Sequence, residues 1–148
     1  MPTETIALAA DHAGVELKAL LEADLQALGY AILDLGTHGS ASVDYPDFGR
    51  AAALAVTEGR ASKGVIVCGS GIGISIAANR VPRARAALCH DALTARLARQ
   101  HNDANILALG ARTTGVDTAR DILKVFFSTA FEGGRHQRRV AKLDADSA

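Results

Sequence analysis

Hydrophobic and polar positions along the chain follow two kinds of pattern. Short apolar runs rich in Val, Ile, Leu and Ala predict strands, and longer stretches with apolar residues three or four positions apart predict helices. We expect strands at residues 5–10, 31–35, 65–68, 85–88 and 106–109. We expect helices at residues 15 to about 28, 46 to about 58, 74–79, 91 to about 100 and 116 to about 128, then a basic helix from 135 to about 143. In the first helix, leucines at helical spacing predict one apolar stripe formed by Leu17, Leu20, Leu21, Leu25 and Leu28.

A helix follows every predicted strand, which is the order typical of parallel sheets. The chain therefore predicts a single α/β domain over residues 1–148. We expect a three-layer, doubly wound, five-stranded parallel sheet with helices on both faces and an added C-terminal helix. Ligands of such sheets bind at the carboxyl ends of the strands. The groups expected at that edge are Asp11 with His12, residues 68–73, His90 with Asp91, and Arg112.

Composition narrows the classes of function. Sixteen basic and sixteen acidic residues cancel, so no overall field favours nucleic acid or an anionic membrane, and any phosphate site has to be local. The first apolar run spans only residues 6–10, between Glu4 and Asp11, which argues against a signal peptide or a membrane span. The two cysteines lack Cys-x-x-Cys spacing. We therefore expect reduced thiols in a cytoplasmic protein rather than a Cys68–Cys89 bridge, which the sequence leaves open.

Residues 64–79 combine a buried strand, alternating glycines and a helix. Gly69, Gly71 and Gly73 permit a tight turn that exposes backbone N–H groups beside the helix start, where partial positive charge favours anions and thiolates. Cys68 stands at the end of the strand, where a thiol has a reason to lose its proton. Neither the third glycine of a dinucleotide fingerprint nor the Gly-Lys-Ser/Thr ending of a P-loop occurs here. The stretch therefore predicts an anion cradle beside a reactive thiol.

Several of these residues also have a purely structural interpretation. Asp11 can cap the helix that follows it, and Cys68 can be a small buried hydrophobic residue. Ser70 can satisfy a local amide in the turn, and His101 with its neighbours can close a helix. The sequence leaves these alternatives open, and a functional His101 has to reach the strand edge.

Basic residues gather near the C-terminus. Arg135 and Arg139 lie four positions apart on the last predicted helix and can clamp one anion, while the glycine pair 133–134 lets the backbone approach a ligand. A solvated basic surface is the alternative. The polar loop at residues 38–47 has irregular spacing for a ligand set, so we predict no metal and no cofactor.

Five segments, taken together, match one protein family. They are Asp11-His12, Asp44-Tyr45-Pro46, Cys68-Gly69-Ser70-Gly71-Ile72-Gly73-Ile74-Ser75-Ile76-Ala77-Ala78-Asn79, Arg99-Gln100-His101-Asn102-Asp103 and Phe131-Glu132-Gly133-Gly134-Arg135-His136. With them the chain resembles the type B ribose-5-phosphate isomerases, within the ribose/galactose isomerase family. One branch of that family carries its base as a glutamate in the glycine loop. Ile74 occupies that position here and the cysteine is present, so the chain resembles the cysteine branch.

The resemblance implies a Rossmann-like fold and roles for individual residues. Cys68 resembles the base that moves a proton between C1 and C2, and Asp11 a proton shuttle between the two sugar oxygens. Ser70 and His101 resemble the ring-opening groups. The implied substrate-binding residues are Gly69, Gly71, Ile72 and Gly73 at the enediolate, His12, Arg135 and Arg139 at the phosphate, Arg112 and Asn102 in support, and Tyr45 along the sugar.

The implied reaction is the metal-independent interconversion of D-ribose 5-phosphate and D-ribulose 5-phosphate, a step of the pentose phosphate pathway, through a cis-enediol. The family also contains isomerases of galactose 6-phosphate, allose 6-phosphate and tetrose phosphates. The resemblance implies a homodimer or dimer of dimers with active sites at the subunit interface, where some of His101, Asn102 and Arg112 cross over. We expect no nucleic-acid or membrane partner. A non-catalytic phosphate- or nucleotide-binding module on the same scaffold is the alternative from another class.

Overall fold

Five parallel strands form the central sheet of the structure, a computed structural model that describes residues 3–145. They are β1 (Thr5–Ala10), β2 (Ala31–Asp34), β3 (Lys63–Cys68), β4 (Ala86–Leu88) and β5 (Ile106–Gly110). Their order across the sheet is β2-β1-β3-β5-β4, and every neighbouring pair is parallel. The central strands are short apolar runs, as expected for strands buried on both faces. The predicted fold class is confirmed.

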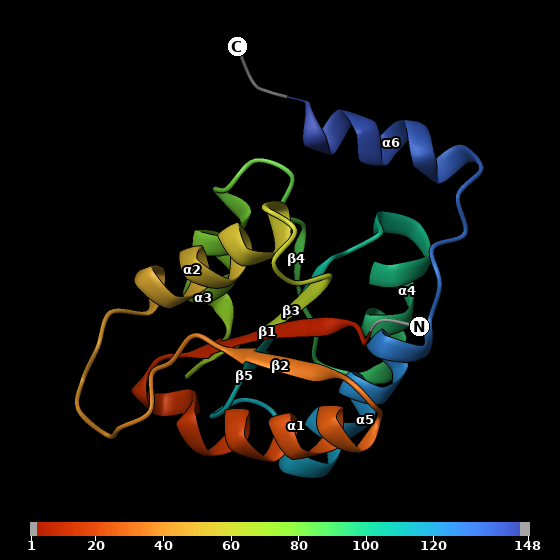
Figure 1. The fold of residues 1–148 in the computed structure, drawn as a ribbon. Coiled ribbons are helices and arrows are strands. Elements are labelled where there is room, and N and C mark those ends of the chain that lie inside the picture. Colours follow the sequence, from red (N-terminus) through yellow and green to blue (C-terminus); the bar gives the residue numbers. More distant parts are fainter. Residues whose placement is uncertain (1–2, 146–148) are drawn as a thin grey trace.

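Helices cover both faces of this sheet (Figure 1). One face carries α1 (Val15–Ala27), α4 (Ala92–Asn102) and α5 (Val116–Ser128), and the other carries α2 (Tyr45–Thr57) and α3 (Ile72–Asn79). A short 3-10 helix, η1 (His12–Gly14), links β1 to α1, and α6 (Arg135–Asp144) ends the fold. None of the helices in residues 3–145 is both long enough and apolar enough to cross a membrane.

Alternate residues of each strand supply two separate cores. In β1, Ile6 and Leu8 belong to the core under α1, α4 and α5, whereas Ala7 belongs to the core under α2 and α3. The two cysteines divide in the same way. Cys68 lies on the α2/α3 side and Cys89 on the opposite side, both are free, and no bridge joins them.

The buried face of α1 differs from the predicted leucine stripe. Leu17, Leu21 and Leu25 are buried, but Leu20 and Leu28 are 37% and 52% exposed. The buried face instead includes Lys18, which is only 4% exposed because its ammonium group reaches the Asp34 carboxylate at the end of β2. Leucine spacing alone could not identify a lysine on the core side of this helix.

The strand order creates a crevice at the carboxyl edge of the sheet. β2 lies on one side of β1 and β3 on the other, and the helices that follow β1 and β3 cover opposite faces. Ligands bind at such reversals of strand order. Asp11 directly follows β1 and Cys68 ends β3, so these two residues flank the crevice.

The predicted boundaries agree with the structure to within about two residues, and the start of α3 shows the physical reason for one such difference. The helix begins at Ile72 rather than at Ile74 because Gly71, with φ of +76°, makes the turn and serves as its N-cap. Gly73 therefore lies inside the helix. A Cβ atom there would meet the Tyr45 ring at less than van der Waals distance, so the glycine provides space for that ring.

Candidate active site

A cavity of about 600 Å³ opens at the carboxyl edge of the sheet, at the crevice between β1 and β3. Side chains and backbone from β3, the loops after β1 and β5, α2 and α3 line it. The lining residues are Asp11, Tyr45, Cys68, Gly69, Ser70, Ile72, Gly73, Ile76, Arg112 and Thr113. Most of the residues that the sequence predicts for catalysis or for the enediolate are therefore neighbours in one cavity.

Cys68 lies at the buried side of this cavity. Its side chain is only 4% exposed, and its sulfur accepts a hydrogen bond from the Gly71 amide, with 3.2 Å between Sγ and N. Cys89 offers a contrast, because burial raises its pKa to about 11 and it does not line the cavity. Of the two thiols, the one beside the glycine turn is positioned for chemistry.

The glycine turn presents a limited set of free donors. The Gly71 amide donates to Cys68, and the Ile72 amide donates to the Ser70 hydroxyl at 3.2 Å. Within residues 3–145, the amides of Gly69, Ser70 and Gly73 have no protein acceptor. Two amides of the turn are thus occupied, and three remain for an anion in the cavity.

Asp11 combines the two roles that its position allowed. Its carboxylate accepts a hydrogen bond from the Ala13 amide at 3.0 Å and so caps η1, and it also lines the cavity. The next residue, His12, lies outside the lining set, and its Nδ1 accepts a hydrogen bond from the Val43 amide at 3.2 Å. That bond leaves the proton of a neutral His12 ring on Nε2, as a donor for a ligand.

Arg112 is the cationic side chain of the cavity lining. It follows β5, and its guanidinium group packs on the Gly69 backbone, where an added Cβ would come within 3.4 Å of Nη1. The arginine therefore reaches the cavity of its own chain. His90 and Asp91 also follow a strand, but Asp91 caps α4 through the Thr94 amide and neither residue lines the cavity.

The remaining predicted site residues lie at the opposite edge of the sheet. They are His101, Asn102, Arg135 and Arg139. α4 begins at the carboxyl end of β4 and runs back, and the Asn105 carbonyl just beyond it accepts a hydrogen bond from Gly64 at the start of β3. The six residues of β3 span roughly 17 Å at the usual strand rise. A single sugar phosphate therefore cannot contact Cys68 and His101 of the same chain.

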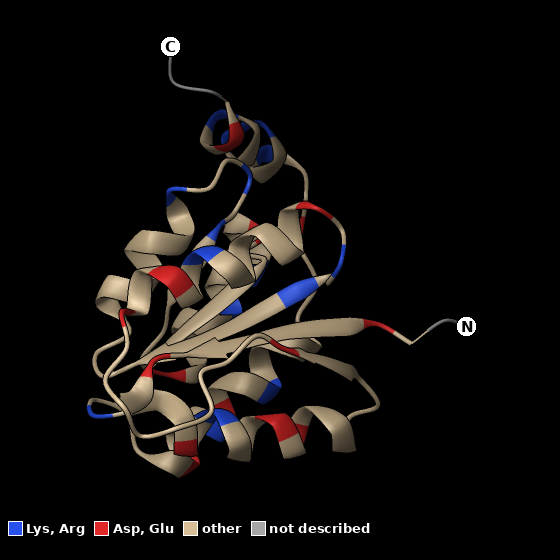
Figure 2. Cartoon of the chain, turned by 60° about the vertical axis from the view of Figure 1, so that its left-hand side comes forward, with Lys and Arg blue, Asp and Glu red and all other residues tan. Residues whose placement is uncertain are grey.

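The C-terminal helix lies beside the end of α4 at this amino edge. The Glu132 amide donates to the Gln100 carbonyl, and Arg85, at the start of β4, forms an ion pair with Asp144 at 2.8 Å. In Figure 2, the ribbon of α6, next to the C-terminus, is blue at several Lys and Arg positions. The basic C-terminal cluster is therefore a surface of the amino edge.

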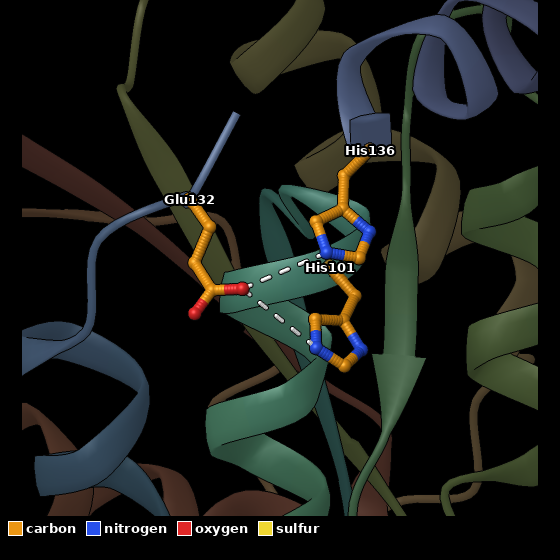
Figure 3. A group of neighbouring side chains, drawn as sticks. All are labelled: His101, Glu132 and His136. Carbon is orange, nitrogen blue, oxygen red and sulfur yellow. Dashed lines mark ion pairs between the residues drawn. The ribbon is translucent and has the colours of Figure 1, made fainter. Parts of the chain in front are cut away.

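Sequence reasoning missed two lining residues and one cluster. Ile76 lies one turn after Ile72 on α3, a spacing that could have indicated a shared face, and Thr113 follows Arg112 in the same loop. The cluster joins His101, Glu132 and His136 (Figure 3). Burial and the electrostatic influence of the neighbouring His101 and Arg135 lower the pKa of His136.

Comparison with known proteins gives a consistent picture. The Ribose/Galactose Isomerase family profile matches residues 6–143. Ribose-5-phosphate isomerase B of Escherichia coli is 43% identical over 140 residues, which cover 95% of this chain and 94% of the relative. The galactose-6-phosphate isomerase subunit LacB of Clostridium acetobutylicum is 37% identical over 137 residues. These aligned residues cover 93% of this chain and 79% of that subunit. The structure of Clostridium thermocellum ribose-5-phosphate isomerase B superposes with a TM-score of 0.93, at 50% identity and 95% coverage of both chains.

Proposed function

The chain belongs to the ribose/galactose isomerase family and is a sugar-phosphate isomerase, and from this premise we propose that it interconverts D-ribose 5-phosphate and D-ribulose 5-phosphate with Cys68 as the base. One observation carries the proposal above all: a thiol ends β3 at the wall of the cavity, beside amides that have no protein acceptor. We expect the protein to act in the cytoplasm and to catalyse a step of the pentose phosphate pathway.

The proposed reaction transfers one proton between neighbouring carbons. Ser70 and His101 assist opening of the sugar ring. The Cys68 thiolate then removes the proton from C2 of the aldose, and the electron pair moves to O1 to give a cis-enediolate. Asp11 moves a proton between O1 and O2, and the thiol returns its proton to C1, so the thiolate is regenerated.

Two kinds of group stabilise this path. The open amides of Gly69, Ser70 and Gly73 and the Arg112 guanidinium group all belong to the cavity lining, and we assign them to the negative charge that develops on the enediolate. Loss of one such donor typically costs about 3 kcal/mol of transition-state stabilisation. A remote phosphate handle fixes the substrate, and we assign it to His12, Arg135 and Arg139, with Asn102 in support and Tyr45 along the sugar.

A second copy of the chain completes the proposed site. His101, Asn102, Arg135 and Arg139 lie too far from Cys68 to act in the same chain, so we assign them to a partner subunit. Arg112, in contrast, is assigned to its own chain. Ile72 and Ile76 on α3 are 54% and 57% exposed at the cavity rim, and apolar side chains in such a position favour a protein interface.

Replacement of the two cysteines tests the base directly. Cys68→Ala should abolish isomerisation and retain sugar-phosphate binding, because the phosphate and hydroxyl contacts stay in place. The matched control is Cys89→Ala, which removes the other free, buried thiol on the opposite side of the sheet. It should keep near wild-type turnover, measured as ketose formation. Wild-type turnover by Cys68→Ala would contradict the assignment.

A panel of substrates tests the sugar. Four-, five- and six-carbon aldose phosphates are assayed for ketose formation without added metal, and ribose 5-phosphate should give the highest kcat/KM. The similarity to a galactose-6-phosphate isomerase subunit makes galactose 6-phosphate the second candidate. If the protein binds these compounds but converts none of them, the isomerase proposal is wrong and the protein is a non-catalytic binding module.

A further inference from the structure

Three side chains capable of binding a metal converge at the amino edge of the sheet (Figure 3). His101 ends α4, Glu132 lies in the segment after α5, and His136 lies in the first turn of α6. A Glu132 carboxylate oxygen is 3.6 Å from Nε2 of His136 and 3.9 Å from Nε2 of His101. All three ligand atoms lie within 4.8 Å of one another, the only such group of three or more found in residues 3–145.

Backbone contacts hold these three side chains on a common frame. The Glu132 amide donates to the Gln100 carbonyl at 3.1 Å, which ties the segment to the end of α4. The turn at residues 133–134 then starts α6, and the His136 amide donates to the Gly133 carbonyl. Glu132 and His136 are therefore fixed relative to α4 without help from their side chains.

The cluster has the chemistry of a site for a borderline divalent cation. Two imidazoles and one carboxylate form a ligand set that zinc accepts with water in its fourth position. Tetrahedral zinc places its nitrogen and oxygen ligands about 3.3 Å apart, so the carboxylate contacts to His136 and His101 need to shorten by about 0.3 and 0.6 Å. The hard cations Mg²⁺ and Ca²⁺ prefer all-oxygen sites.

One side chain has to move on metal binding. The two imidazole rings now stack, with centroids 4.4 Å apart and planes 14° from parallel, whereas a metal lies in the plane of each ring that binds it. His136 is buried, but the His101 side chain is 40% exposed and can turn toward the shared ion. Arg135 and Arg139 on the same helix oppose a cation and limit the affinity.

From this geometry we propose that His101, Glu132 and His136 bind Zn²⁺ or a similar divalent transition metal, and that the bound ion inhibits isomerisation. The inhibition rests on the proposed function, because the metal takes the ring nitrogen of His101 that would otherwise assist ring opening in the partner subunit. The metal site itself rests on the three side chains alone.

Competition for Zn²⁺ between the full-length protein and a chromophoric chelator tests the site. The wild type should bind one ion per chain, and His136→Gln and Glu132→Gln should each bind at least 10-fold more weakly. His90→Gln is the matched control, because His90 is an exposed histidine outside the cluster, and it should bind as the wild type does. Circular dichroism establishes that each variant is folded. Equal zinc affinity of the wild type and folded His136→Gln would overturn the site.

Zinc inhibition is then measured against the zinc-free rate of each protein. Zinc should slow the wild type and His90→Gln at concentrations that leave His136→Gln unaffected. Zinc that binds to the cluster and leaves turnover unchanged would support the metal site and remove His101 from the ring-opening step. Failure of the cluster to bind zinc would leave the isomerase proposal intact, so the two proposals fail separately.

Discussion

At the scale of single residues, the Lys18–Asp34 pair shows how a polar contact shapes the edge of the fold. The ammonium nitrogen of Lys18 lies 2.6 Å from an Asp34 oxygen, and the same oxygen accepts a hydrogen bond from the Gly36 amide. Burial alone would raise the pKa of Asp34, but the hydrogen bonds from Lys18 and Gly36 outweigh it and bring the pKa below its ordinary value of 3.8. The pair therefore stabilises the fold while Asp34 is ionised.

Asp34→Asn should destabilise the protein by about 2 kcal/mol at neutral pH, because the buried ammonium of Lys18 loses its charged partner. The native pKa of Asp34 is depressed, so its contribution is complete above the unfolded value and disappears as the pH falls through the native value. Urea unfolding of the wild type and of Asp34→Asn, at a series of pH values from 7 downward, measures the pH dependence of this contribution. The difference in unfolding free energy should shrink toward zero at acid pH.

Removal of the lysine provides the control for this prediction. Lys18→Met in the Asp34→Asn background should recover part of the lost stability, because no unpaired charge then remains in the core. A stability difference between wild type and Asp34→Asn that stays constant with pH would show that the ion pair contributes little.

At the scale of elements, the turn between β3 and α3 depends on backbone space. Gly71 has a positive φ, and a Cβ atom there would come within 2.8 Å of the Leu109 backbone and 3.0 Å of the Gly110 amide. The glycine at position 71 therefore allows β5 to lie directly beside the loop that lines the cavity. A side chain at position 71 would push the loop away from Cys68, whose sulfur accepts its hydrogen bond from this very amide.

Gly71→Ala should cost about 3 kcal/mol or more, from left-handed strain combined with overpacking against backbone. Gly39→Ala is the matched control, because Gly39 has open space around it and no positive φ, so it should change stability by less than about 0.5 kcal/mol. Thermal or urea unfolding compares the two variants. Similar stabilities would show that the turn tolerates a side chain.

The sequence was sufficient to predict the order of the elements, because short apolar runs and helical periods alternate without interruption. It also predicted which residues follow the strands, and therefore most of the cavity lining, including Cys68 and Arg112. The sequence could not predict tertiary contacts between segments that are far apart along the chain. The hydrogen bond from the Val43 amide to His12 depends on how a loop packs, and the contact between the Tyr45 ring and Gly73 depends on how a helix packs. No local sequence pattern encodes either contact.

At the scale of the whole molecule, the direction of α4 determines how the predicted site residues are distributed over the sheet. A helix that follows a parallel strand runs back to the amino edge, so His101, at its end, has to lie far from Cys68. The alternation of strands and helices along the chain could have predicted this separation, but the family motifs alone do not show which residues share a chain. The two groups of site residues therefore lie at opposite ends of one sheet.

Mixed dimers test the proposed division. Chains with Cys68→Ala and chains with His101→Ala should each be inactive alone, but co-refolded mixtures should recover about a quarter of the wild-type rate. Half of the dimers are then mixed, and each mixed dimer has one complete site of two. The rate of ketose formation measures this recovery.

The control combines two substitutions of residues that line the same cavity of one chain. Mixtures of Cys68→Ala and Asp11→Asn chains should stay inactive, because both residues belong to one cavity and neither cavity of the mixed dimer is complete. Absence of recovery in the first mixture, with mixed dimers demonstrated by mass spectrometry, would place His101 outside the proposed site.

The separation of Cys68 from His101 has a consequence for gene dosage. In the proposed assembly each isolated chain carries halves of two different sites, so the catalyst forms only by association and its amount follows mass action. Near the dissociation constant of the dimer, halving the number of chains would lower total turnover by more than half. The output of this enzyme would then respond to its own expression level more steeply than that of an isomerase complete in one chain.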